Sequence, residues 1–153
     1  MGVLTGLIRD LTARLGGRRS STPDQVRELL DKREVDQAAL ALNSLAPHVP
    51  DRELVLLCLR GEVAFRRHED EAADQLFREA LALAPGLADA HYGLSLVMLA
   101  REDQESALRH AQFSVNLGSA PRFSAQLGLC QLAQGNHVRA KEALMRATRL
   151  DPH

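Results

Sequence analysis

The amino-acid sequence predicts an all-α protein built from antiparallel helical hairpins, and three observations support this prediction. The 153 residues include 45% hydrophobic but only 3% aromatic residues, with no Trp, and their Ala- and Leu-rich composition favours helices over strands. Five kinds of position recur at a nearly constant interval along the chain. Finally, Pro85 and Pro152 stand at the ends of two of the resulting windows, where they would stop a helix.

The recurring positions divide residues 54–153 into three windows, 54–87, 88–120 and 121–153, each with two helical segments. The recurring sets are Ala73, Ala107 and Ala140; Ala80, Ser114 and Ala147; Gly61, Ser95 and Gly128; Leu83, Leu117 and Leu150; and Pro85, Ser119 and Pro152. In the first window the helices are expected at residues 54–67 and 71–82, with a polar turn between them. Such a segment forms an antiparallel helical hairpin.

Small residues in these windows mark the places where two helices are expected to cross closely. Gly inside a helix costs up to about 1 kcal/mol relative to Ala, so Gly61 and Gly128 are expected where a β-carbon would not fit. Ala73 faces the same crossing from the second helix of its window. Phe77 and Leu144 lie one turn beyond the crossing and are expected to fill the space there.

A period of about 34 residues with two helices per period resembles the tetratricopeptide repeat. The resemblance covers about two thirds of the chain, and it implies a right-handed α-solenoid of stacked helical hairpins. The sequence departs from the family in lacking the Trp near the start of each window, where Leu57, His91 and Ser124 stand. In the middle window Ser95 also replaces the usual Gly, and Ala111 replaces the usual aromatic residue.

Residues 20–53 are expected to form a fourth, degenerate hairpin ahead of the three windows. Thr22 and Gln25 have the spacing of a capping box, and Pro23 occupies the first helical position. Together they form a strong helix-start signal. This segment has no Gly at the expected crossing.

Residues 1–19 are expected to form an N-terminal amphipathic helix that ends at a Gly-Gly hinge. One helical face carries Val3, Leu4, Leu7, Ile8, Leu11 and Leu15. An apolar stripe of this kind must be covered by something. The helix could fold back and cap the solenoid, pair with its copy in a homo-oligomer, lie on a membrane surface, or act as a partner-binding or flexible arm. These alternatives remain open at the level of the sequence.

Charge and motifs argue against several classes of function. The net charge is −1, which gives no overall attraction to nucleic acid or to anionic lipid. The chain has no apolar run long enough for a membrane-spanning helix and no export signal. Cys58 and Cys130 lack metal-ligand spacing, and the six His residues are scattered. Since catalytic motifs are missing as well, we expect a cytoplasmic protein that is not an enzyme and needs no cofactor or metal.

The resemblance to tetratricopeptide-repeat proteins implies that the first helices of the hairpins line a concave groove that binds a partner. The groove positions implied for the three windows are Val55, Cys58, Glu62, Phe65 and Arg66; Asp89, Tyr92, Leu96, Leu99 and Ala100; and Arg122, Ala125, Leu129, Leu132 and Ala133. Most of these residues are apolar, and Arg122 is the cation that could meet a carboxylate. The groove therefore suits an apolar or amphipathic partner segment better than a clamped carboxylate terminus.

Two hypotheses of function follow. The stretch from Ala120 to Leu144 is similar to the last repeat of small bacterial chaperones that hold type III secretion translocators, which implies a secretion-type chaperone or assembly adaptor. The alternative is a self-assembling structural scaffold, anchored to a membrane or a complex through its N-terminal helix. Both hypotheses describe a non-enzymatic module for protein–protein interaction.

Overall fold

A computed structural model of the chain describes residues 20–152 and consists of two compact units, which meet in sequence between Pro50 and Asp51. Over residues 20–152 every regular element is an α-helix, apart from an isolated bridge between Ser21 and Leu45. The prediction of an all-α fold is therefore confirmed. The amphipathic helix predicted for residues 1–19 lies outside the described residues.

The first unit contains a short helical hairpin formed by α2 (Pro23–Asp31) and α3 (Val35–Asn43). The predicted capping box opens α2: the Gln25 N–H donates to Thr22 Oγ1 at 3.3 Å, and the Thr22 N–H donates to Gln25 Oε1 at 3.0 Å. Two otherwise unpaired backbone donors at the helix start gain partners in this way. The facing sides of the hairpin bury Val26 and Leu30 of α2 with Ala38 and Leu42 of α3.

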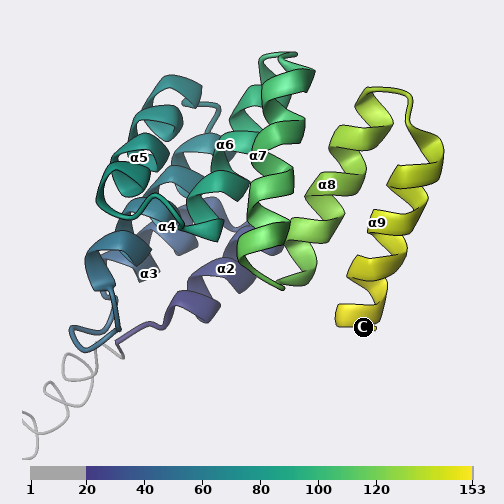
Figure 1. Ribbon diagram of the computed structural model, residues 1–153. Helices are drawn as coiled ribbons and strands as arrows, with labels where there is room; N and C mark the ends of the chain where they lie inside the picture. Colours follow the sequence, from purple (N-terminus) through teal and green to yellow (C-terminus); the bar gives the residue numbers. More distant parts are fainter. Residues whose placement is uncertain (1–19, 153) are drawn as a thin grey trace, which may run out of the picture. The chain divides into compact units, whose positions relative to one another are not determined.

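The second unit consists of three successive helical hairpins (Figure 1). They are α4 (Arg52–Arg66) with α5 (Asp70–Leu83), α6 (Ala88–Ala100) with α7 (Gln104–Leu117), and α8 (Pro121–Ala133) with α9 (His137–Leu150). Each second helix also packs against the first helix of the next hairpin, and the first helices α4, α6 and α8 contact one another in turn. Pro85 follows α5 and Pro152 follows α9 within two residues, as predicted from their inability to continue a helix.

The predicted close crossings occur at the glycines. A Cβ on Gly61 would lie 2.7 Å from the Phe77 ring, and one on Gly128 would lie 2.7 Å from Leu144 Cγ. Gly93 of α6 is tighter still, because a Cβ there would come even closer to the same Phe77 ring. Phe77 is fully buried. It thus fills the space between its own hairpin and the next, and the sequence analysis did not assign Gly93 to this contact.

The turn inside each hairpin uses one residue in the left-handed conformation. In the second unit these residues are His68 with φ 61°, Glu102 with φ 62° and Gly135 with φ 76°. Arg33 has φ 61° in the turn of the first unit. Only Gly adopts this conformation without steric cost, so three of the four turns hold a mildly strained residue.

No helix among residues 20–152 combines the length and the apolar character needed to cross a membrane.

Candidate partner-binding surface

The residues predicted to line a groove all lie on α4, α6 and α8, the first helices of the three hairpins. We call the surface that these three helices form the first-helix face. Because the helices contact one another in sequence order, residues at equivalent positions of successive repeats lie in rows that run across the face.

A polar cluster joins the three first helices at one part of this face. Arg122 Nη2 of α8 donates a hydrogen bond to Asp89 Oδ1 of α6. Burial opposes the charged form of Arg122, but the carboxylates of Glu62 on α4 and Asp89 outweigh burial and raise the pKa of the guanidinium. The cluster thus brings three predicted site residues together, and Arg122 is engaged with these carboxylates.

Two aromatic rings hold the Arg122 side chain in place. The guanidinium carbon lies 5.4 Å from the centroid of the Tyr92 ring and 5.2 Å from that of Phe123. The two rings are 5.7 Å apart and inclined by 47°. Such stacking favours a fixed orientation of the cation. Tyr92, predicted as an amphipathic anchor for a partner, is half-buried in this cluster.

The apolar part of the first-helix face becomes more exposed toward the last hairpin. Leu96 and Leu99 of α6 are half-buried, whereas Leu129 and Leu132 of α8 are 49% and 41% exposed. The four side chains form two pairs at equivalent repeat positions, Leu96 with Leu129 and Leu99 with Leu132. Phe65 is half-buried at the matching position of α4. These five side chains form an apolar row across the face, and the row ends at the exposed Leu129 and Leu132.

The structure corrects the groove prediction at Cys58 and Glu62. Cys58 is 1% exposed because it packs with Leu57, Ala80 and Ala90 in a core cluster. Glu62 is 7% exposed and faces the Arg122 cluster. Neither side chain offers open surface to a partner. Val55 is half-buried.

The chemistry of the described residues gives no sign of a reactive centre on this face. Burial raises the pKa of the Cys130 thiol to about 11, so the thiol stays protonated at neutral pH. Gln126 Nε2 donates to its sulfur at 3.6 Å. Residues 20–152 contain no group of three His, Cys, Asp or Glu side chains that could hold a metal ion.

A pair of histidines in contact was not predicted from the sequence. His91 of α6 and His110 of α7 place their Nδ1 atoms 3.0 Å apart, although the two residues are distant in sequence. The His91 ring also lies 5.2 Å from the ring of Phe113. Sequence spacing did not reveal the pair, since the histidines lie on different helices and meet only when the hairpin packs.

Comparisons with known proteins identify the fold alone. No protein-family model and no curated protein sequence matches the chain. Among solved structures, "MamA 41-end from Desulfovibrio magneticus RS-1" is similar, with 19% identity and a TM-score of 0.61, covering 99% of this chain and 97% of that one. A second, "Crystal structure of MamA", has 19% identity and a TM-score of 0.58 over 99% and 90% of the two chains. The repeat columns and the likeness to MamA together show a tetratricopeptide-like helical-repeat fold.

Proposed function

We propose that this chain is a non-enzymatic module that binds another protein through the first-helix face. The observation that carries the proposal is the apolar row that ends in Leu129 and Leu132, the two leucines of the row that are more than two-fifths exposed. A partner segment with apolar side chains would bury them. Each buried aliphatic side chain contributes roughly 1.5 to 3 kcal/mol.

The Arg122 cluster sets the polar border of the proposed site. Its guanidinium already has Asp89 as a hydrogen-bond acceptor and two aromatic rings around it. A partner carboxylate would have to compete with these contacts. Affinity is therefore expected to come from the apolar row, and orientation from the cluster, which suits an amphipathic segment laid into the face.

A more specific version of this proposal is a secretion-type chaperone or assembly adaptor. In that role the first-helix face would hold an apolar segment of a partner and keep it from aggregating. The proposal is supported by the helical-repeat fold, which presents successive helices as one continuous surface. Co-purification of the full chain from its native host, followed by mass spectrometry, would name the partner and supply its binding segment.

The decisive experiment replaces an exposed leucine of the face with a charged residue. We expect Leu129→Asp and Leu132→Asp each to weaken binding of the partner segment at least about tenfold, since about 1.4 kcal/mol corresponds to one decade. Leu83→Asp is the matched control, because Leu83 is 56% exposed but lies on α5, outside the first-helix face. Binding is measured by fluorescence anisotropy after circular dichroism has shown that each variant is folded.

The salt dependence of the affinity distinguishes binding through apolar contacts from binding through ion pairs. Exposed ion pairs contribute less than about 1 kcal/mol each, so raising the salt concentration should change the affinity little. Tight binding by both folded Asp variants, together with loss of binding in high salt, would refute the apolar mechanism. If the same substitutions instead dissociate oligomers of the chain in sedimentation experiments, the face is covered by a second copy, as in the scaffold hypothesis.

A further inference from the structure

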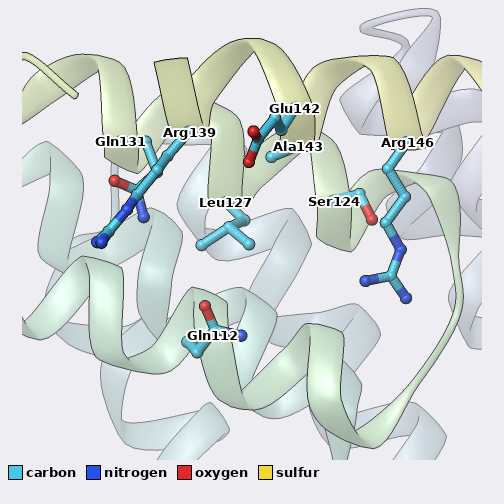
Figure 2. A pocket seen from close by; sticks show the side chains of 8 residues that line it. All are labelled: Gln112, Ser124, Leu127, Gln131, Arg139, Glu142, Ala143 and Arg146. Carbon is cyan, nitrogen blue, oxygen red and sulfur yellow. The ribbon is translucent and has the colours of Figure 1, made fainter. Parts of the chain in front are cut away.

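A pocket of about 310 Å³ lies between α7, α8 and α9 (Figure 2). Its floor is formed by Ser124, Leu127 and Gln131, which follow one another along a single stripe of α8. This stripe is offset by two positions from Arg122 and Leu129, or about 200° around the helix. The pocket therefore opens on the side of α8 that faces away from the first-helix face.

The equivalent space in the preceding hairpin is filled by rings. There, His91 of α6 contacts His110 of α7 through Nδ1 atoms 3.0 Å apart, with ring centroids at 5.3 Å. Phe113 of α7 lies against the His91 ring at 5.2 Å. Three aromatic side chains thus close the gap between these two helices.

The pocket exists because the last hairpin replaces all three rings. One repeat further along the chain, the positions equivalent to His91, His110 and Phe113 hold Ser124, Ala143 and Arg146. Two of these side chains are much smaller, and the third, Arg146, extends from α9 along the edge of the pocket (Figure 2). The same backbone arrangement therefore carries three contacting rings in one hairpin and a pocket in the next.

The floor of the pocket contains a polar atom that requires a partner. Gln131 is only 6% exposed, and its Oε1 atom is buried without a hydrogen-bond partner among the described residues. The matching residue of the preceding hairpin is Met98, which needs no such partner. A buried acceptor without a donor is costly, so an occupant that displaces the side chains covering this atom gains by donating an N–H or O–H to it.

Two cations of α9 flank the pocket. Arg139 and Arg146 are two helical turns apart, which places them about 10 Å from each other along the helix. No ion pair within the described residues joins either of them to a carboxylate, although Glu142 lies between them on the same stripe. Leu127 and Ala143 supply an apolar surface between the two charges.

We propose that this pocket binds an acidic peptide segment in an extended conformation. A polyproline-type chain rises about 3.1 Å per residue and repeats every three residues, so acidic side chains at positions i and i+3 lie on one side about 9 Å apart. That spacing matches Arg139 and Arg146. Backbone N–H groups of the same segment can donate to Gln131 Oε1 while its acidic side chains reach both cations, a span that a small anion is too short to cover. The proposal does not depend on the first-helix face.

The test uses NMR spectra of the full ¹⁵N-labelled chain, titrated with the capped peptide Ala-Glu-Pro-Ala-Glu-Pro-Ala. We expect saturable shifts of amides around Ser124, Gln131 and Arg146, and none with the peptide that carries Gln in place of Glu. Free glutamate and inorganic phosphate serve as small-anion probes and should bind much more weakly. The proposal would be overturned if the Gln peptide or phosphate bound as tightly as the Glu peptide. It would also be overturned if the amide signals around the pocket did not shift at peptide concentrations up to about millimolar.

Variants separate the site from general charge attraction. Arg146→Gln should weaken the peptide about tenfold through loss of a charge-assisted bond. Arg60→Gln, which removes the same charge from an exposed position on α4, should leave the affinity unchanged. An equal loss in both variants would mean nonspecific attraction and refute the site.

Two further variants copy the preceding hairpin. The triple substitution Ser124→His, Ala143→His and Arg146→Phe should fill the pocket and abolish peptide binding. Gln131→Met should weaken binding without lowering the melting temperature, because it removes an unsatisfied acceptor. If the triple variant folds and still binds, the peptide lies elsewhere. If Gln131→Met binds as before, the amide takes no part and the proposed backbone contact is wrong.

Discussion

At the scale of single residues, Phe77 crowds glycine more closely than any other side chain of the described residues. Its buried ring lies against the backbone of Gly61 in α4 and of Gly93 in α6. The sequence predicted the first contact, because Gly61 belongs to a recurring set. It did not predict the second, because Gly93 recurs in neither of the other windows and its partner lies in another hairpin.

Because Gly93 touches Phe77, the effect of Gly93→Ala on stability should change sign when the ring of Phe77 is removed. In the natural background Gly93→Ala should destabilise the protein by about 1 to 3 kcal/mol, because the new methyl group meets a ring that has no room to move. Phe77→Ala alone should cost about 3 to 5 kcal/mol. When it is combined with Phe77→Ala, the Gly93→Ala change should stabilise by up to about 1 kcal/mol, through its helix propensity alone.

Denaturant unfolding of the two single variants and the double variant measures this coupling. Gly86→Ala is the control for an uncrowded glycine, since a Cβ there would lie 3.9 Å from Leu117 Cδ2, its nearest neighbour. Additive effects of the two substitutions would show that the ring and Gly93 do not interact as the structure indicates.

At the scale of elements, the positions of the helices could be predicted from the sequence, but the left-handed residues in the turns could not. Helices expected at residues 54–67 and 71–82 were found as α4 (Arg52–Arg66) and α5 (Asp70–Leu83). Apolar and small residues recur with the helix period, so helix positions leave a signal in the sequence. The left-handed turn residues His68 and Glu102 leave none, because neither is the Gly that this conformation favours.

Exposure on the first-helix face was also only partly predictable. The repeat interval places Glu62 at the position of its helix that is equivalent to Leu96 and Leu129. It does not reveal that Glu62 is covered in the structure while Leu129 is open. Burial depends on the neighbouring helices and on the size of their side chains, which a single helical stripe does not contain.

The histidine pair links α6 to α7. His91 Nε2 lies 3.1 Å from the Pro85 carbonyl oxygen and donates to it, so in the neutral ring of His91 the Nδ1 atom accepts from His110 Nδ1. Burial, and then the charge of His91, lower the pKa of His110 below its usual value of 6.5. Arg78 and Arg109 act in the same direction, and Asp74 opposes them.

This lowered pKa predicts a loss of stability in mild acid. The unfolded chain protonates His110 near pH 6.5, whereas the folded chain does so only at lower pH, so the stabilisation is complete above pH 6.5 and is lost as the pH falls through the folded pKa. Melting temperatures measured from pH 7.5 to about pH 5 should therefore fall more steeply for the natural chain than for His110→Gln. His137→Gln, at an exposed position on α9, should keep the natural slope. Equal slopes in all three proteins would contradict the prediction.

At the scale of the whole molecule, the chain consists of two compact units. The hairpin of α2 and α3 forms one, and the three hairpins of residues 51–153 form the other. Two hydrophobic clusters, which extend from Leu57 to Cys130, lie wholly within the second unit. The first-helix face and the pocket beside α9 are built from residues of that unit as well. Folding and binding should therefore survive when the second unit is produced alone.

A fragment of residues 51–153 tests this independence. Helical repeats are stabilised by contacts within each hairpin and with its neighbours, and every such contact among α4 to α9 is retained in the fragment. We expect it to unfold cooperatively, with helicity per residue close to that of the full chain in circular dichroism. It should also bind the acidic peptide with unchanged affinity, because Gln131, Arg139 and Arg146 keep their surroundings. A fragment that loses its cooperative transition would show that residues 1–50 complete the core of the second unit. A folded fragment that no longer binds the peptide would place residues 1–50 in the binding site itself.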